Sequence, residues 1–540
     1  MATTKLFSLD EVARHNREGD LWTVINNDVY DLTKFVDLHP GGSGVLLHHT
    51  VGGKDSSELF FSLHRSEILQ KYARLKIGSI DTTSPPPYIL PVDGELSPVP
   101  HAEPTWLDPK YHSPYYNDSH RRLQKEMRHF FDTEVRAEAR AHELTHERPT
   151  KRLVELMGSP RWNIHAMRMG PGKHLHGLTL PGGVRGEDFD YFHELVVIGE
   201  LSRIGAPGYM AGLQAGMVIG LPPVLNFGTD KMRREVLPEI LAGRKFISLA
   251  ISEAFAGSDV AGMRTEAKLS DDGKHYIVHG TKKWITNGNF SDYFMTGVRT
   301  GPNSLTMMLI PRTDEVDTKI IKTSYSHAAG TAYVTFDGVK VPVENVLGGV
   351  GNGLKVILSN FNHERWVINA RIARYSRLIY EETFKWAHLR EVQGKKLIDN
   401  AVVRQKFARI IAKVDAGQSW LEQITFQMCT MTYAEQSKLL AGPMAFLKTF
   451  LSIAGGEISD DCVQIFGGRG ITQGGLGSLI NSHQQSYKFD SILGGSEEVL
   501  ADLGVRQAMK NMPKAVLCTS GNPPSSNATS AGPRSLLTKL

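Results

Sequence analysis

Two histidines near the start of the chain have a spacing and surroundings that could hold a metal-centred planar ligand. His39 lies in a His-Pro-Gly-Gly turn, and His64 follows an apolar helical stretch 25 residues further along. Pro40 stiffens the turn, while Gly41 and Gly42 let the backbone approach a flat ligand closely. Two neutral imidazoles that face each other across one iron hold a low-spin, electron-transferring haem. The pattern therefore predicts a haem b site with His39 and His64 as iron ligands.

A second set of motifs combines glycines, hydroxyls and an aromatic residue. LAISEAFAGSDVAG at residues 249–262 sets small residues beside acids and two serines. Its backbone N–H groups could approach a polar planar ligand or a phosphate. GTKKWITNG (280–288), REVQG (390–394) and QIFGGRG (464–470) follow it along the chain. Each motif alone is a weak signal, and only the ordered set indicates one binding site.

The N-terminal elements that must position the histidines are short. Residues 6–80 alternate β-like runs with small helical pieces, which predicts an α+β unit. Residues 81–104 contain seven prolines, which fix φ and remove backbone donors. We expect this stretch to be a semi-rigid linker that lets one domain dock on another.

The remaining elements change from helix to strand and back. Helical periodicity extends to about residue 241, and β-like alternation follows between Phe246 and Val346. Asp-Gly turns are expected at Asp272–Gly273 and Asp337–Gly338. Long helical periodicity returns from residue 353, with a Gly-rich break near 466–477.

Length and composition bound the class of protein. The chain has 540 residues, which predicts three to four domains, and 61 Lys+Arg against 57 Asp+Glu leave a net charge of +4. Nucleic-acid binding is not expected at so small a charge excess. We also expect no membrane span, because no run of about 18 apolar residues occurs. Three cysteines (Cys429, Cys462, Cys518) fit neither a disulfide framework nor a zinc site.

The motifs resemble two known families. Residues 6–80, with both histidines and Asp31-Leu32-Thr33, resemble cytochrome b5, and residues 115–510, with the four ordered motifs, resemble the acyl-CoA dehydrogenase family. The resemblance implies a multidomain fold, in which a small α+β domain precedes a helical domain, a β-barrel-like middle domain and a C-terminal four-helix bundle. The implied boundaries are a haem-binding domain at 1–80, the linker at 81–104, the three dehydrogenase domains at 105–245, 246–352 and 353–511, and a flexible tail at 512–540.

The dehydrogenase resemblance implies FAD in the cleft between the β domain and the C-terminal helices. Ile251 and Ser252 match positions at the pyrimidine end of the flavin, and Trp284, Ile285 and Thr286 match the strand beside the ring. Ser258 matches a hydroxyl near the pyrophosphate and the CoA entrance. The remaining cofactor positions, several of which imply a neighbouring subunit's FAD and hence a homodimer or homotetramer, are Arg390, Gln464, Gly468, Ser496 and Glu498.

Removal of an α-proton from an acyl thioester needs a base, and a desolvated carboxylate suits that task. Many family members place it in a C-terminal Tyr-Glu-Gly-Thr stretch, but the corresponding residues here are Leu493-Gly494-Gly495-Ser496. Another branch, typified by isovaleryl-CoA and long-chain acyl-CoA dehydrogenases, holds a glutamate before an arginine at a helix start. Glu364 in Asn362-His363-Glu364-Arg365 fits that position, and the alternative is a first-turn acid that complements the helix dipole.

The resemblance also implies roles for residues near the base. Gly494 is expected to donate its backbone N–H to the thioester oxygen. Glu497 and Glu498, just beyond the Leu493–Ser496 stretch, are the rival carboxylates. The expected substrate contacts are Ser258, Asn362, His363, Arg365 and Gly495.

The sequence thus predicts α,β-dehydrogenation of an acyl-CoA to a 2-enoyl-CoA by FAD, with the fused haem as an electron relay. Two alternatives stay open: an external reductase could feed haem and flavin to saturate an enoyl thioester, or the chain could be a non-catalytic acyl-CoA or haem sensor. An external electron acceptor or reductase is expected in either direction of flow.

The C-terminal Thr538-Lys539-Leu540 resembles a peroxisomal Ser-Lys-Leu signal. A peroxisomal location is therefore expected, with mitochondrial and cytoplasmic locations as alternatives.

Overall fold

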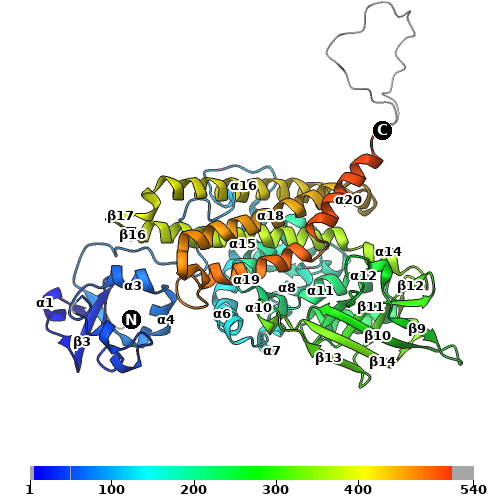
Figure 1. Cartoon of the computed structure of the whole chain (residues 1–540), viewed down its shortest axis with the longest axis horizontal. Coiled ribbons are helices and arrows are strands. Elements are labelled where there is room, and N and C mark those ends of the chain that lie inside the picture. The colour runs from blue at the N-terminus through cyan, green and yellow to red at the C-terminus, as the bar shows by residue number, and fades with distance from the viewer. Residues whose placement is uncertain (1–4, 49, 514–540) are drawn as a thin grey trace, which may run out of the picture.

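The computed structural model describes residues 5–48 and 50–513. The first domain is built on a five-stranded sheet with the order β1-β5-β4-β3-β2, and it lies at one end of the molecule (Figure 1). Its strands are β1 (Leu6–Phe7), β2 (Asn16–Arg17), β3 (Asp20–Ile25), β4 (Asp28–Asp31) and β5 (Lys76–Ile80). Its helices are α1 (Leu9–Val12), α2 (Ser43–Leu46), α3 (Ser57–Leu63) and α4 (Glu67–Lys71).

The hairpin of β3 and β4 follows directly from its sequence. Asn26 and Asn27 have φ of 55° and 68°, the left-handed values that a two-residue turn of this kind requires. Asparagine adopts this region more readily than most residues. The turn sets the register in which Val24 faces Val29, and both side chains are buried in the small core.

The second domain is helical. Its helices are α5 (Asp118–Phe130), α6 (Arg136–Thr145), α7 (Lys151–Met157), α8 (Ile164–Met167), α9 (Tyr191–Ser202), α10 (Pro207–Gly212), α11 (Ala215–Gly220), α12 (Pro222–Phe227) and α13 (Asp230–Leu241). A π-helical turn, Phe131–Val135, joins α5 to α6, and a small hairpin of β6 (Thr179–Leu180) and β7 (Val184–Arg185) precedes α9.

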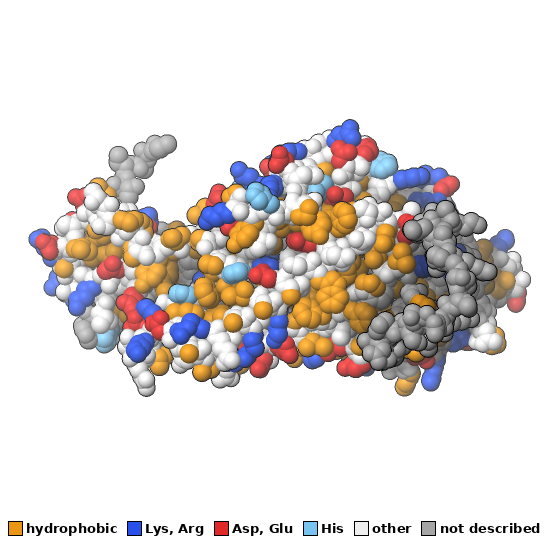
Figure 2. All heavy atoms as spheres, turned by 90° about the horizontal axis from the view of Figure 1, so that it is seen from above, with side chains coloured by type: hydrophobic (Ala, Val, Ile, Leu, Met, Phe, Trp, Pro, Cys, Tyr) orange, Lys and Arg blue, Asp and Glu red, His pale blue; other side chains and the backbone are white. Residues whose placement is uncertain are grey.

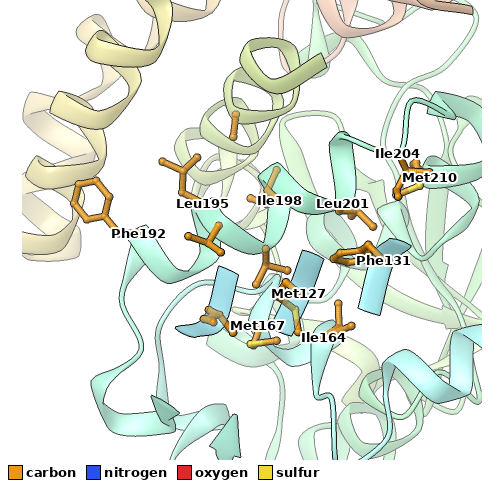
Figure 3. Packing of buried hydrophobic residues seen from close by; sticks show 14 of the residues in the cluster. Met127, Phe131, Ile164, Met167, Phe192, Leu195, Ile198, Leu201, Ile204 and Met210 are labelled. Carbon is orange, nitrogen blue, oxygen red and sulfur yellow. The ribbon is translucent and has the colours of Figure 1, made fainter. Parts of the chain in front are cut away.

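The apolar side chains of this domain meet around α9. Figure 3 shows Leu195, Ile198 and Leu201 on α9 beside Met127 of α5 and Met167 of α8. The core extends to Trp366 and other residues of the C-terminal helices, so α9 is buried on nearly all sides. A helix of this kind is stable only in the middle of a large core.

The third domain contains an eight-stranded sheet. Seven strands follow the order β13-β14-β10-β9-β11-β12-β15, and the eighth, β8, pairs with β11. The strands are β8 (Ile247–Ala250), β9 (Glu266–Leu269), β10 (His275–Ile285), β11 (Tyr293–Gly301), β12 (Ser304–Pro311), β13 (Val316–Ile320), β14 (Ala332–Pro342) and β15 (Val346–Leu347).

One of the two predicted Asp-Gly turns is wrong. Gly273 lies in the turn between β9 and β10, as expected. Asp337–Gly338 instead lies inside β14, where the pairing with β10 shifts register between Val278 and His279. Gly338 has φ of 75°, which is typical of a β-bulge with glycine in the left-handed region. Sequence alone does not separate such a bulge from a turn.

The C-terminal domain is a bundle of long helices. The helices are α14 (Gly353–Leu358), α15 (Phe361–Leu389), α16 (Ala401–Thr430), α17 (Tyr433–Leu439), α18 (Ala441–Phe466), α19 (Ser478–Ile492) and α20 (Glu497–Lys510), and a hairpin of β16 (Glu391–Val392) and β17 (Lys395–Lys396) joins α15 to α16. α18 packs against α15, α16, α19 and α20. The predicted Gly-rich break separates α18 from α19, and Gly467 ends α18 at φ of 62°.

The proline-rich stretch 81–104 is attached at both of its ends. Asn26 of the first domain accepts a hydrogen bond from the backbone N–H of Tyr88 at 2.9 Å. Tyr380 of α15 donates its hydroxyl to the carbonyl of Pro100 at 2.8 Å. The expected linker therefore follows the surface of both domains and fixes their relative position.

Among the described residues, no single helix is long and apolar enough to cross a membrane. One bent pair, Tyr433–Leu439 with Ala441–Ile471, meets that requirement by length and composition only. The C-terminal Thr538-Lys539-Leu540 lies outside the described residues, so the predicted targeting signal stays a prediction.

Candidate functional site

The two predicted haem ligands face each other. The ring centroids of His39 and His64 are 6.0 Å apart. Each Nδ1 is 3.3 Å from a backbone carbonyl, that of Gly42 for His39 and that of Phe60 for His64. These contacts fix Nδ1 as the donor and leave each Nε2 without a partner among the described residues, which is the arrangement of a histidine ready to bind a metal.

The surroundings of the histidines also fit a haem. A side-chain carbon on Gly41 would lie 2.8 Å from Cε1 of His39, so any residue other than glycine would displace the imidazole ring. Burial lowers the pKa of His64, which favours the neutral imidazole that binds iron. The cavity beside the rings is lined mainly by apolar side chains, including Leu32, Phe35 and Leu46.

The haem cavity opens onto the body of the molecule, which comprises the three domains that follow residue 104. Its volume is about 1290 Å³, and both parts of the chain line it. The residues contributed by the body are Arg136, Arg140 and Leu144 of α6, Gly205 and Ala206 before α10, and Ser478, Leu479 and Ser482 of α19. A haem held by His39 and His64 would therefore lie between the two parts.

Ion pairs hold the two parts together at this cavity. Arg65, next to the iron ligand His64, places Nη1 2.5 Å from Oε2 of Glu382 on α15. Glu67 of α4 pairs with Arg140 of α6. Both pairs are mostly shielded from water, so they constrain the docked arrangement more than exposed pairs would.

A second cavity, of about 100 Å³, contains the predicted base. Glu364 lies in the first turn of α15, and Val367, Ile368, Arg371 and Tyr375 line the cavity from the same helix. These positions share one face of a helix with 3.6 residues per turn. The opposite wall consists of Arg168, Ile198, Leu201, Ser202, Ala206, Pro207, Met210, Ala215, Val218 and Ile219, and Thr286, Phe489 and Leu493 complete the lining.

The electrostatics of Glu364 suit a base. Burial raises the pKa of its carboxyl group, although Arg365 and His363 act in the opposite direction. Its carboxylate forms no ion pair within 4 Å in the described part of the chain, so it is available to a substrate. The alternative of an exposed acid that merely complements the helix dipole does not match its place in a cavity wall.

The residues beside Glu364 point elsewhere. His363 places Nε2 2.9 Å from Oε1 of the buried Glu194, and this carboxylate keeps the pKa of His363 above its usual value despite burial. Asn362 donates to the carbonyl of Gln436, and Arg365 to that of Gly494. Asn362, His363 and Arg365 do not line the cavity, because helix geometry directs neighbouring side chains about 100° apart. Their hydrogen bonds position the elements around Glu364, and their predicted contact with substrate stays a prediction.

The turn Leu493–Ser496, where many family members carry their catalytic glutamate, packs against helix α15, which carries Glu364. A side-chain carbon on Gly494 would lie 2.9 Å from Cδ1 of Ile368 and 3.5 Å from Cγ of Arg365. The N–H of Gly494 has no acceptor among the described residues, as an oxyanion donor requires. Lys448 holds the carbonyl of Gly495, a predicted substrate contact, at 3.1 Å. Gly494, the base position of one branch, therefore lies beside the helix turn that carries Glu364, the base position of the other branch.

The predicted flavin residues leave their polar groups free. The hydroxyls of Ser252, Ser258 and Thr286 have no hydrogen-bond partner among the described residues, and Thr286 lines the same cavity as Glu364. Trp284 has φ of 67° beside a register shift in β10, and its side chain is 51% exposed although it is a large aromatic. An exposed indole on a strained strand and free hydroxyls nearby fit the wall of a flavin site.

The remaining predicted flavin positions fall into two groups. Ile251 is buried at the end of β8, where its carbonyl accepts a hydrogen bond from Lys282, and Ile285 belongs to the core of the sheet. Ser496 and Glu498 begin α20, close to Gly494 in the chain.

The positions expected to meet a neighbouring subunit's cofactor are exposed: Arg390, Gln464 and Gly468. The side chain of Arg390 has no ion pair or hydrogen bond within the described chain.

Sequence reasoning missed two residues of the cavity wall, Arg168 and Arg371. Arg168 follows α8 in a segment without a recognisable motif, and Arg371 is one of several arginines on a long helix. The packing of α8 on α9, and of α9 on α15, brings them together with Glu364.

The fold, the haem cavity and the Glu364 cavity define a haem-binding domain joined to a flavin-dependent oxidoreductase. Family models match at residues 8–81 (cytochrome b5-like heme/steroid binding domain) and at 117–244, 248–339 and 351–509 (acyl-CoA dehydrogenase N-terminal, middle and C-terminal domains).

Individual proteins show the same relationship. Acyl-CoA dehydrogenase apdG of Emericella nidulans is 36% identical over 430 residues, which cover 77% of this chain and 96% of that protein. Acyl-CoA dehydrogenase AFT10-1 of Alternaria alternata is 32% identical over 432 residues, covering 78% and 98%. A solved putative acyl-CoA dehydrogenase from Mycobacterium smegmatis aligns with a TM-score of 0.64 at 23% identity, over 74% of this chain and 99% of that one.

The chain therefore belongs to the acyl-CoA dehydrogenase family and carries an N-terminal cytochrome b5-like domain. It is an FAD-dependent oxidoreductase that acts on CH–CH groups, with FAD and haem as its cofactors. The predicted families, fold class and cofactors are confirmed.

Proposed function

We propose that Glu364 is the base of the acyl-CoA dehydrogenation and that the electrons then leave through the haem of the same chain. When bound, FAD accepts a hydride from C3 of the acyl group, and the haem iron transfers single electrons. The Glu364 carboxylate takes the proton from C2, so the acyl group loses one proton and one hydride and gains a double bond. The product is the 2-enoyl thioester.

The residues around Glu364 support this role. Val367, Ile368 and Leu493 keep water away from the carboxylate, and desolvation makes it a stronger base. The free N–H of Gly494 is available to the thioester oxygen, where negative charge develops as the proton leaves. Arg365 and Lys448 fix this turn through the carbonyls of Gly494 and Gly495.

The observation that carries the relay is that Ala206 lines both cavities. The backbone at Gly205–Ala206 therefore lies between the haem cavity and the cavity that contains Glu364, which is called the acyl cavity from here on. Tyr375, which lines the acyl cavity, donates its hydroxyl to the carbonyl of Gly205 at 3.3 Å. A haem in one cavity and a flavin beside the other would then have this segment between them, which supports electron exchange without a diffusing carrier.

The base is tested with Glu364→Gln, and Glu126→Gln on the exposed face of α5 is the matched control. We expect flavin bleaching by an acyl-CoA to slow about 100- to 10,000-fold in Glu364→Gln and to stay unchanged in the control. Unchanged bleaching in Glu364→Gln would refute the assignment and direct attention to Glu497.

The relay is tested by anaerobic mixing of the holoenzyme with acyl-CoA while both spectra are recorded. We expect the flavin to bleach first and the reduced haem bands to follow without any added carrier. A haem that stays oxidised after complete flavin bleaching would overturn the relay and leave the dehydrogenase intact.

We further propose a homo-oligomer, either a dimer or a tetramer. The exposed positions Arg390, Gln464 and Gly468 support it, because they match contacts to a neighbouring subunit's cofactor. Apolar side chains are also exposed among the charged ones on the face that carries the long C-terminal helices (Figure 2). Light scattering of the holoenzyme gives the mass, and Arg390→Ala is expected to lose FAD. A monomer with full flavin content would contradict this proposal.

A further inference from the structure

The acyl cavity contains a buried positive charge that the dehydrogenation itself does not use. Arg168 lies directly after α8, and only 5% of its surface is exposed. Its Nη1 donates to the carbonyl of Leu213 at 2.6 Å. No carboxylate of the described residues lies within 4 Å of its guanidinium group. The buried Glu194 acts on Arg168 only from a longer distance and pairs directly with His363, so Arg168 has no carboxylate in direct contact. A buried charge without a direct ionic partner is costly, so its presence in a binding cavity requires an explanation.

A second guanidinium group in the same cavity is only partly satisfied. Arg371 pairs with Asp490 through Nη2, but its buried Nε has no partner. Arg371 is seven residues after Glu364 on the same face of α15, which places it about 10 Å further along the helix. Burial lowers the pKa of both guanidinium groups to about 10, and the charge of Arg371 lowers that of Arg168 as well, so the two cations lie near each other.

Arg168 and Arg371 lie in a cavity whose lining is otherwise mostly apolar. Apart from Ser202, Thr286, Glu364 and Tyr375, the other lining residues are apolar, including Ile198, Leu201 and Met210. A plain fatty acyl chain would match those residues but would cover both guanidinium groups with hydrocarbon. The phosphates of FAD and CoA are expected near the exposed Ser258 and not in this enclosed space.

We propose that Arg168 and Arg371 form an anion-binding subsite for the far end of the acyl chain. The preferred substrate is then the CoA monothioester of a dicarboxylic acid, whose free carboxylate lies several carbons beyond the C2–C3 bond. Arginine suits this role because its planar group binds a carboxylate through two parallel hydrogen bonds. This inference rests on the proposed role of Glu364 at the other end of the cavity.

The test compares ω-carboxyacyl-CoAs with methyl-ended acyl-CoAs of equal chain length, with flavin bleaching of the holoenzyme as the readout. We expect kcat/KM to favour the carboxylate by about tenfold or more at the best length. Equal values, or a preference for the methyl end, would overturn the subsite but not the dehydrogenase. Loss of bleaching with every acyl-CoA would overturn both.

Variants then assign the preference to these residues. Arg168→Met is expected to reduce the ratio of the two kcat/KM values about tenfold or more, and Arg168→Lys to keep part of it, because lysine retains the charge but not the planar group. Arg185→Met, at the exposed end of β7, is the matched control. An unchanged ratio in Arg168→Met would contradict the subsite. Because the wild-type comparison needs no variant, misfolding of Arg168→Met leaves the proposal testable.

Discussion

The ion pair between Arg65 and Glu382 gives the sharpest test of electron transfer between the two parts of the chain. Arg65 is adjacent to the iron ligand His64, and Glu382 lies on the helix that also carries Glu364. The two side chains are only 17% and 15% exposed. Glu382→Arg turns this attraction into repulsion and should separate the haem domain from the body. Glu382 lines neither the haem cavity nor the cavity that contains Glu364.

The magnitude follows from the distances. Unit charges at about 4 Å interact by about 4 kcal/mol at the effective dielectric constant of a protein surface. Replacing attraction by repulsion therefore costs at least about 3 kcal/mol, which corresponds to roughly a 100-fold loss in the docking equilibrium. Lys385, 3.2 Å from Glu382, adds to the repulsion.

The assay is anaerobic stopped-flow mixing with acyl-CoA, with flavin and haem followed separately. We expect haem reduction to slow at least about tenfold in Glu382→Arg, while flavin reduction stays the same. The double variant with Arg65→Glu restores opposite charges and should recover haem reduction. Asp188→Arg, which reverses an exposed pair with Arg185, controls for added charge. Haem reduction at the wild-type rate in Glu382→Arg would refute the reasoning.

Three further predictions concern single residues. His39→Ala and His64→Ala should each abolish the low-spin haem spectrum and leave the flavin spectrum intact, and a retained spectrum would exclude that histidine as a ligand. Because burial raises the pKa of Glu364, kcat should fall as the pH decreases through a value above the ordinary glutamate range, and this limb should disappear from a pH profile of Glu364→Gln. Gly494→Ala combines φ of 66° with a carbon 2.9 Å from Ile368, so it should lower the free energy of unfolding by about 1–2 kcal/mol and reduce kcat; calorimetry that shows no change would contradict the packing.

Local sequence was enough to propose the haem ligands and to place the order of helical and β regions along the chain. His39 is held by the turn in which it lies, and Phe60, the acceptor for His64, is only four residues before it. Such contacts depend on neighbours in the chain, so a short motif specifies them. Glu364 was also recognisable, because its place at a helix start is a local feature.

The Asp337–Gly338 error shows where local reasoning fails. A glycine with positive φ serves a turn or a bulge equally well, and the choice depends on whether a partner strand continues past it. Here β10 pairs on both sides of Gly338, so the strand continues. Proline content likewise indicated a linker at 81–104 but not its contacts with Asn26 and Tyr380.

The sequence by itself determined the families, the cofactors and the identity of the candidate ligands and base, because each depends on residue types at fixed spacings. Only the tertiary structure decided that Ala206 separates two cavities and that Arg168 and Arg371 share one of them. The residues that line these cavities come from segments far apart in the chain. They lie together because the buried helix α9 packs against the C-terminal helices. Burial also sets the cost of an unpaired charge, a quantity that no sequence motif records.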